Sequence, residues 1–128
     1  MILADTDVLI DYLAGVQPVA DQILRHVETE RLKTTAVSCF ELLSGAREGK
    51  RGDAIRKLVS ALDVLPLDRA SAERAAWLRR ELERIGQTIG MGDSLIAGIA
   101  LANDLPLFTR NRKHFDRVPH LKLVDTRA

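Results

Sequence analysis

Short apolar segments alternate with helix-forming segments from one end of the chain to the other. Runs that predict strands lie at residues 2–4, 34–37, 107–109 and 121–124. A further run at 64–67 predicts an edge strand, because Pro66 has no amide hydrogen for a ladder. Strands separated by helices form parallel sheets covered by helices on both faces. We therefore predict an α/β fold, a three-layer α/β/α sandwich around a short, mainly parallel sheet.

The helix-forming segments show apolar residues at three- and four-residue spacing, which is typical of amphipathic helices. The predicted helices lie at residues 7–13, 19–27, 38 to 45 or 49, 55–62, 75–85 and 93–103. Gly15 and Gly86 are expected to end two of them. The segment 93–103 is apolar nearly all round, so we expect that helix to be buried.

The length and composition fit one ordinary domain over residues 1–128, with no membrane span and no signal peptide. Cys39 is the single cysteine, which excludes an intramolecular disulfide, and we expect a cytoplasmic protein. Lys and Arg number 19 against 18 Asp and Glu, so the net charge is close to zero. Any binding to nucleic acid must therefore depend on a local basic patch.

Three carboxylates and one amide follow the predicted strands. Asp5 follows the first strand, Glu41 lies one turn into the helix after the second, Asp93 opens the buried helix, and Asn111 follows residues 107–109. In a parallel sheet the carboxyl ends of the strands share one edge, where ligands bind. A hard cation such as Mg²⁺ relieves the repulsion between clustered carboxylates and can activate water near a phosphate. The pattern indicates metal-assisted phosphodiester hydrolysis.

Each acid also has a structural explanation when taken alone. Ser38 and Glu41 have the spacing of a capping box. Asp93 could complement a helix dipole, and Asp5 could form an Asx-turn. These explanations leave unexplained why all the acids fall at one edge.

Three further polar residues lie near these positions in the sequence. Asp7 is expected to cap the first helix, with a place near the metal as the alternative. Asp11 is expected on a solvated helix face, and His114 on the surface or at a helix start rather than as a ligand.

Four stretches of the chain resemble, in order, the motifs of the PIN-domain family, and in particular its VapC-type toxins. They are residues 2–10 with Asp5-Thr6, residues 37–45 with Glu41, residues 89–97 with Asp93, and residues 107–115 with Asn111. Each stretch is short, but together they extend over most of the chain.

The resemblance implies a metal-dependent endoribonuclease in which Asp5, Glu41 and Asp93 hold Mg²⁺ or Mn²⁺ and Asn111 supports a water or the substrate. Asn111 departs from the fully acidic family pattern because it is neutral, and Asp116 is an alternative source of the missing charge. We therefore expect one firmly held ion, with any second ion arriving with the RNA.

The resemblance also implies partners, namely an RNA substrate, a VapB-type antitoxin and a second copy of the chain in a homodimer. The expected products carry a 5′-phosphate and a 3′-hydroxyl. Arg110, Arg112 and Lys113 cluster after residues 107–109, close to the predicted metal site. Such cations would contact RNA phosphates and position the strand without reading its bases. The low aromatic content, 4%, argues against a platform for stacked bases.

Two other functions fit parts of the pattern. Asp5-Thr6-Asp7 also resembles the opening of haloacid-dehalogenase-type phosphatases, although Ala97 stands where a second acid is expected and no Lys occurs between Lys57 and Lys113. A binding module that has lost its catalytic function would be consistent with the neutral Asn111. Uptake of Mn²⁺ distinguishes an intact site from a decayed one.

Overall fold

The computed structural model describes residues 1–125 as seven helices around one four-stranded sheet. The strands are β1 (Ile2–Ala4), β2 (Leu32–Thr35), β3 (Asp63–Leu65) and β4 (Leu107–Phe108). The helices are α1 (Thr6–Ala14), α2 (Val19–Glu28), α3 (Ala36–Ser44), α4 (Lys50–Ala61), α5 (Arg69–Arg84), α6 (Met91–Ala102) and α7 (Arg112–Phe115). None of these helices combines the length and the apolarity needed to cross a bilayer.

The sheet has the order β3-β2-β1-β4, and every neighbouring pair is parallel. The central strand β1 pairs with β2 on one side, where Ile2 lies opposite Leu32, and with β4 on the other, where Leu3 lies opposite Leu107. The carboxyl ends of all four strands therefore point to the same edge. The predicted α/β fold and the edge position of β3 are confirmed.

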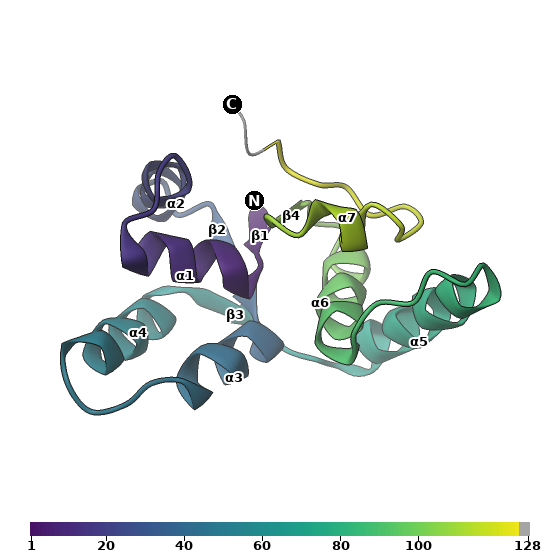
Figure 1. The fold of residues 1–128 in the computed structure, drawn as a ribbon, viewed down its shortest axis with the longest axis horizontal. Helices are drawn as coiled ribbons and strands as arrows, with labels where there is room; N and C mark the ends of the chain where they lie inside the picture. The colour runs from purple at the N-terminus through teal and green to yellow at the C-terminus, as the bar shows by residue number, and fades with distance from the viewer. Residues whose placement is uncertain (126–128) are drawn as a thin grey trace.

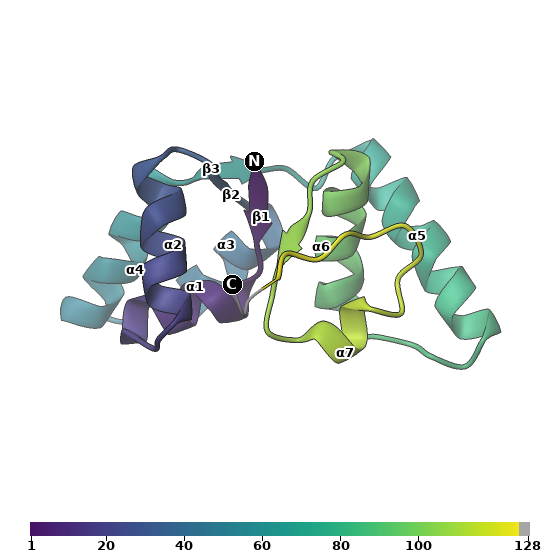
Figure 2. The same cartoon turned by 90° about the horizontal axis from the view of Figure 1, so that it is seen from above.

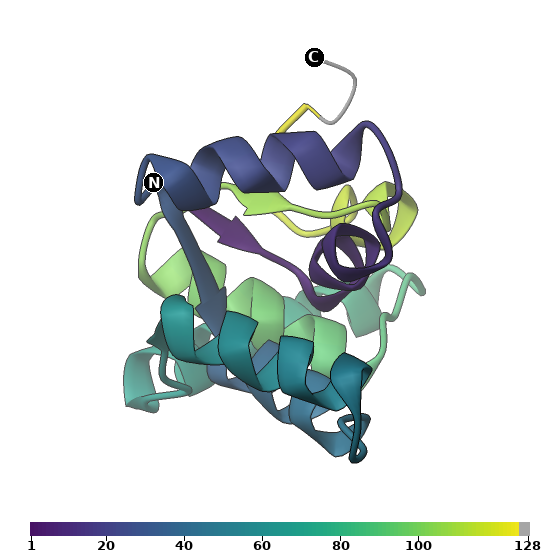
Figure 3. The same ribbon diagram turned by 90° about the vertical axis from the view of Figure 1, so that its left-hand side faces the viewer.

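The sheet separates two apolar cores, and α1, α2 and α4 lie on one face while α5, α6 and α7 lie on the other (Figures 1 and 2). Figure 3 faces the first of these layers, with its helices in front of the strands. Successive side chains of a strand point to opposite faces. Ile2 and Ala4 accordingly join the first core, whereas Leu3 joins the second.

The buried helix α6 packs closely against α5 because Gly98 has no side chain. A Cβ added at Gly98 would lie 2.6 Å from the Cβ of Ala75 and 2.6 Å from the carbonyl oxygen of Ser71. Both distances are shorter than carbon and oxygen atoms tolerate, so a larger residue would push the two helices apart. This contact fixes α6, which carries Asp93.

The second strand ends two residues earlier than the sequence pattern predicts. β2 stops at Thr35, whose side chain caps α3 by accepting a hydrogen bond from the Ser38 amide at 2.9 Å. Val37 therefore lies in the helix. The β-branched run 34–37 favours a strand, but an N-cap at Thr35 satisfies a helical amide that would otherwise lack a partner.

The strand predicted at 121–124 is wrong. This segment contacts β4 through one isolated bridge between Leu107 and Leu123. The amide of Leu107 donates to the Lys122 carbonyl and the amide of Val124 donates to the Leu107 carbonyl, each at 2.9 Å. Because β4 has only two residues, it offers too short an edge for a longer ladder.

Candidate active site

The four predicted polar residues meet at the carboxyl edge of the sheet. They lie in one open pocket of about 220 Å³, lined by Asp5, Thr6, Asp7, Ile10, Glu41, Asp93 and Asn111. Asp5 comes from the end of β1, Glu41 from α3, Asp93 from the first turn of α6, and Asn111 from the N-cap of α7. The parallel sheet thus brings together residues from four distant parts of the chain.

Asp5 is the most buried carboxylate of the pocket, with 5% of its surface exposed. Its two oxygens accept hydrogen bonds from the Thr6 amide at 2.7 Å and from the Thr109 hydroxyl at 2.8 Å. Burial, followed by repulsion from the Asp7 carboxylate, raises the pKa of Asp5 to about 7, although both hydrogen bonds oppose the shift. Loss of its proton therefore leaves a poorly compensated negative charge.

Asp7 lies in the pocket and does not cap the first helix, so the favoured expectation for it is wrong. The N-cap of α1 is Asp5. One Asp7 oxygen, Oδ2, accepts from the Arg110 amide at 3.1 Å, whereas Oδ1 is buried and no described residue hydrogen-bonds to it. Burial also raises the pKa of Asp7. A buried carboxylate oxygen without a donor is a feature that a bound cation would satisfy.

Glu41 reaches the pocket from the second turn of α3. Its Oε1 accepts a hydrogen bond from the Thr6 hydroxyl at 2.8 Å. The capping-box interpretation is wrong, because Thr35 caps α3 and Ser38 is already inside the helix. Glu41 is exposed and free of the helix terminus, so its carboxylate is available to a ligand.

Asp93 and Asn111 form a hydrogen-bonded pair on the opposite wall. The Asn111 amide nitrogen Nδ2 lies 3.3 Å from Asp93 Oδ2 and 2.8 Å from Nδ1 of His114. His114 was expected on the surface or at a helix start, and it lies in the short helix α7, partly exposed; its contact with Asn111 was not predicted. The three-residue spacing from Asn111 to His114, at the start of a short helix, was the one available signal.

The basic residues after β4 are partly engaged within the protein. Arg110 forms an ion pair with Asp11 at 2.7 Å, and Arg112 donates to the Val124 carbonyl at 2.7 Å, whereas Lys113 is exposed. The expectation of a solvated face for Asp11 is therefore wrong, since Asp11 is buried and pairs with Arg110 of the loop after β4. Asp116 is exposed at the end of α7 and is not part of the pocket lining.

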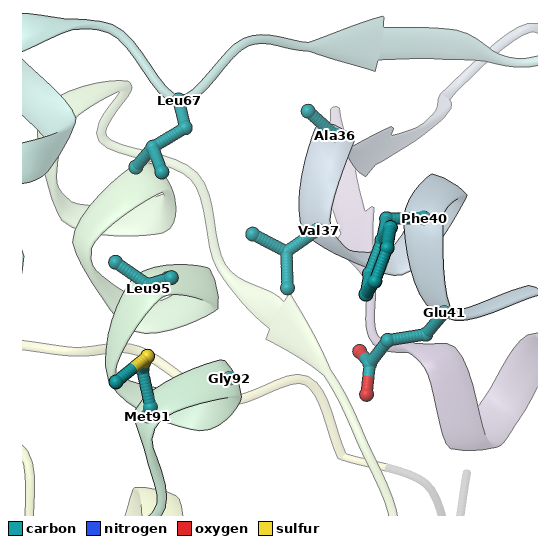
Figure 4. Close-up of a pocket in the computed structure, with 8 residues that line it drawn as sticks. All are labelled: Ala36, Val37, Phe40, Glu41, Leu67, Met91, Gly92 and Leu95. Atoms are coloured by element: carbon teal, nitrogen blue, oxygen red, sulfur yellow. The ribbon is translucent and has the colours of Figure 1, made fainter. Parts of the chain in front are cut away.

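An apolar groove adjoins the acidic pocket and shares Glu41 with it. We call it the α3–α6 groove; its lining is Ala36, Val37, Phe40, Glu41, Leu67, Met91, Gly92 and Leu95 (Figure 4). Figure 4 shows Val37 and Phe40 on α3 across from Leu95 and Met91 on α6. The exposed fractions of Phe40 and Met91 are 70% and 67%, which is high for large apolar side chains.

The carboxylates of the pocket, the side-chain carbonyl of Asn111 and the hydroxyl of Thr6 offer oxygen atoms to a cation. Oxygen is the ligand type that Mg²⁺ and Mn²⁺ prefer. Within residues 1–125, no three His, Cys, Asp or Glu side chains converge closely enough to enclose an ion by themselves. Mg²⁺ commonly keeps several waters and binds through one or two carboxylates. The open acidic pocket, with its raised pKa values and the unmatched Oδ1 of Asp7, fits such an ion.

Comparison with known proteins agrees with this fold. The sequence profile of the PIN domain matches residues 2–121. Ribonuclease VapC10 of Mycobacterium tuberculosis is 38% identical over 122 residues, covering 95% of this chain and 91% of that protein. The tRNA(fMet)-specific endonuclease VapC of Shigella flexneri is 35% identical over 95 residues, covering 71% and 72%. The chain belongs to the PIN-domain family.

Among solved structures, the DNA-bound VapBC complex of Salmonella typhimurium contains a chain that superimposes with a TM-score of 0.82. Sequence identity is 26%, and the match covers 98% of both chains. Membership of the PIN-domain family sets aside the haloacid-dehalogenase alternative.

Proposed function

We propose that this PIN-domain protein is a Mg²⁺- or Mn²⁺-dependent endoribonuclease, the toxin of a type II toxin–antitoxin pair, acting in the cytoplasm. The observation that carries the proposal is the convergence of Asp5, Glu41, Asp93 and Asn111 in one pocket at the carboxyl edge of the sheet. The ribonuclease and endonuclease names of the similar proteins support it.

Asp5 and Asp93 would hold the ion, and Glu41 would hold it or orient the attacking water. A bound divalent ion supplies two effects, a lower pKa of bound water and neutralisation of charge on the phosphate. The Thr109 hydroxyl keeps Asp5 in place from behind, and Asn111 would support a water or the substrate. Hydrolysis would leave a 5′-phosphate and a 3′-hydroxyl.

The RNA backbone would be positioned by cations beside the pocket. The net charge of the protein is +1, so its overall field attracts RNA little. Lys113 is exposed and free to contact a phosphate, and Arg110, half exposed beside Asp11, could reach one while keeping its ion pair. Arg112 would contribute charge from its site on the Val124 carbonyl.

A VapB-type antitoxin would hold the toxin inactive, as the VapBC complexes among the similar structures suggest. The protein would also form a homodimer through the α3–α6 groove, since an exposed apolar surface is buried when two copies pair about a twofold axis. Light scattering at micromolar concentration should give twice the 14.2 kDa chain mass, and Phe40→Asp should reduce it. A wild-type protein that is monomeric at these concentrations would exclude this interface.

The test is cleavage of labelled cellular RNA by purified, antitoxin-free protein with Mg²⁺ or Mn²⁺, and then with EDTA. Asp93→Asn should abolish cleavage in a protein that still folds, while Glu81→Gln, whose partner is Arg84 on α5, should cleave normally. Cleavage that persists in EDTA or in Asp93→Asn refutes the proposed site. Absence of both cleavage and Mn²⁺ binding favours the decayed binding module.

A further inference from the structure

His114 contacts two side chains that line the acidic pocket, since its Nδ1 lies 2.8 Å from Asn111 Nδ2 and 3.4 Å from Asp93 Oδ2. It is on α7, three residues after Asn111, and its side chain is 46% exposed. Asn111 and Asp93 line the pocket and His114 does not. Any influence of His114 on a ligand in the pocket must therefore pass through one of these two neighbours.

The contacts around the Asn111 side chain determine which way its amide faces. Its Nδ2 lies 3.3 Å from Asp93 Oδ2 and 2.8 Å from His114 Nδ1. A carboxylate can only accept, so Nδ2 is the donor to Asp93. Its second hydrogen then points to Nδ1, which accepts it in the tautomer that carries the ring proton on Nε2. With both amide hydrogens bound, the end of the side chain left for a ligand is the carbonyl oxygen Oδ1.

The backbone of Asn111 is held independently of its side chain. The backbone amide of Asn111 donates to the Thr109 hydroxyl at 3.0 Å, and that hydroxyl donates to Asp5 Oδ2 at 2.8 Å. Thr109 is fully buried. The main chain at position 111 therefore stays in place when the side-chain amide rotates, so this rotation is the one motion that a neighbour must restrict.

An amide at this position needs orientation in a way that a carboxylate does not. A carboxylate presents an oxygen whichever way it turns, whereas a flipped Asn presents an NH₂ group. An NH₂ group repels a cation and cannot accept from water. The neutral residue that departs from the acidic family pattern thus depends on a neighbour that fixes its rotation.

We infer that His114 is a positioning residue, which holds the Asn111 amide with its carbonyl oxygen toward the acidic pocket. This role deepens the proposed nuclease function and rests on it for its biological meaning. The orientation of the amide, however, is a property of the protein alone. It can be measured without metal or RNA.

Two substitutions separate the hydrogen bond from the bulk of the side chain. In His114→Asn the side-chain oxygen can occupy the place of Nδ1 and still accept from Asn111. His114→Leu has nearly the same shape as that variant but no acceptor. Asp116→Asn, at the exposed end of the same helix, controls for changes in α7 itself.

The chain has two asparagines, Asn103 and Asn111, so labelling with ¹⁵N-asparagine gives two pairs of side-chain amide signals in an NMR spectrum. Asn103 donates to the Ile99 carbonyl at 2.8 Å and serves as an internal reference. In His114→Leu we expect one Asn111 hydrogen to shift upfield and to exchange with water about tenfold faster, as expected for a lost hydrogen bond. The spectrum of His114→Asn contains a third pair from the new side chain, and in this variant the Asn111 pair should regain its protection. An Asn111 pair unchanged in His114→Leu overturns the inference.

RNA cleavage provides the second readout. His114→Leu should lower kcat about tenfold with little change in KM, the range typical for loss of a supporting hydrogen bond at a metal site, and His114→Asn should recover most of it. The double variant His114→Leu/Asn111→Ala should be no slower than Asn111→Ala alone. Additive losses would show that His114 acts by another route. If the wild-type protein cuts no RNA, the proposed function fails while the amide measurement still decides the role of His114.

Discussion

The acids of the pocket and the acids of α5 have opposite surroundings. On α5, Glu73, Glu81 and Glu83 are each paired with an arginine one helical turn away, at 2.8, 2.9 and 3.6 Å. In the pocket, Asp5 and Asp7 lie close to each other, and burial and mutual repulsion raise the pKa of Asp5. Exposed ion pairs contribute little to stability and mainly keep a helix soluble. Like charges gathered in a partly buried pocket destabilise the free protein, which marks the pocket as functional.

The largest predicted difference between the two groups is in catalysis. Asp5→Asn and Glu41→Gln should each slow RNA cleavage about 100-fold or more, above the 10- to 100-fold typical for groups that only support a metal ligand. Glu73→Gln and Glu83→Gln should stay within about twofold of wild type. Initial rates with a labelled RNA measure both pairs. Equal losses of cleavage rate in the pocket variants and the α5 variants would show that the pocket acids have no special role in catalysis.

The second difference concerns stability. The pKa of Asp5 is raised from 3.8 to about 7, so the folded protein holds this proton more tightly than the unfolded chain. Stability therefore falls as pH rises from about 4 to about 7. Asp5→Asn should raise the free energy of unfolding of the metal-free protein at pH 8 by about 2 kcal/mol, and by much less at pH 4.

Urea unfolding at the two pH values checks this prediction. Glu81→Gln provides the matched control and should change the free energy of unfolding by less than about 0.5 kcal/mol at either pH. If Asp5→Asn is destabilising at pH 8, Asp5 is not the strained charge that the geometry indicates.

A smaller effect is expected on metal affinity. Protons and cations compete for Asp5, and the competition is strongest below its pKa of about 7. The affinity for Mn²⁺ should therefore be about tenfold weaker at pH 6 than at pH 8. Calorimetry in two buffers of different ionisation enthalpy would also detect the released proton. An affinity that does not depend on pH over this range argues against Asp5 as a ligand.

Asp11 is intermediate between the two groups, since it is buried like the pocket acids but paired like those of α5. Its partner Arg110 lies at 2.7 Å and is 54% exposed at its side chain. Removing the partner leaves a buried charge, so Arg110→Gln should cost about 1 kcal/mol of stability, reduced by solvent at the arginine. The double variant Asp11→Asn/Arg110→Gln should recover part of the loss in thermal unfolding. A cost that is the same with and without Asp11 would exclude the ion pair as its cause.

The sequence predicted the sheet and the site well where the signal depends on order along the chain. Apolar runs followed by helices defined the parallel sheet, and the position of Asp5, Glu41 and Asp93 after strands predicted their meeting. The ends of elements were less predictable. Thr35 and Ser38 are both good helix caps, and only the packing of α3 decides which of them is used.

Other features of the pocket depend on side-chain contacts that spacing does not encode. Asp5 and Asp7 both lie at the start of α1. Asp5 caps this helix, whereas Asp7 Oδ2 accepts a hydrogen bond from the backbone amide of Arg110, a hundred residues away. Asp11 likewise depends on a distant contact, since its partner Arg110 comes from the loop after β4. Such pairings become visible only once the strands are aligned.

The most direct test of the proposed metal site is the position of a bound Mn²⁺ ion in crystals of the antitoxin-free protein. Anomalous scattering identifies the ion independently of the refined coordinates. We expect a peak in the pocket among Asp5, Glu41 and Asp93, which disappears in Asp93→Asn crystals. Crystals soaked in Mn²⁺ that show no peak in this pocket, or one that survives in Asp93→Asn, would contradict it.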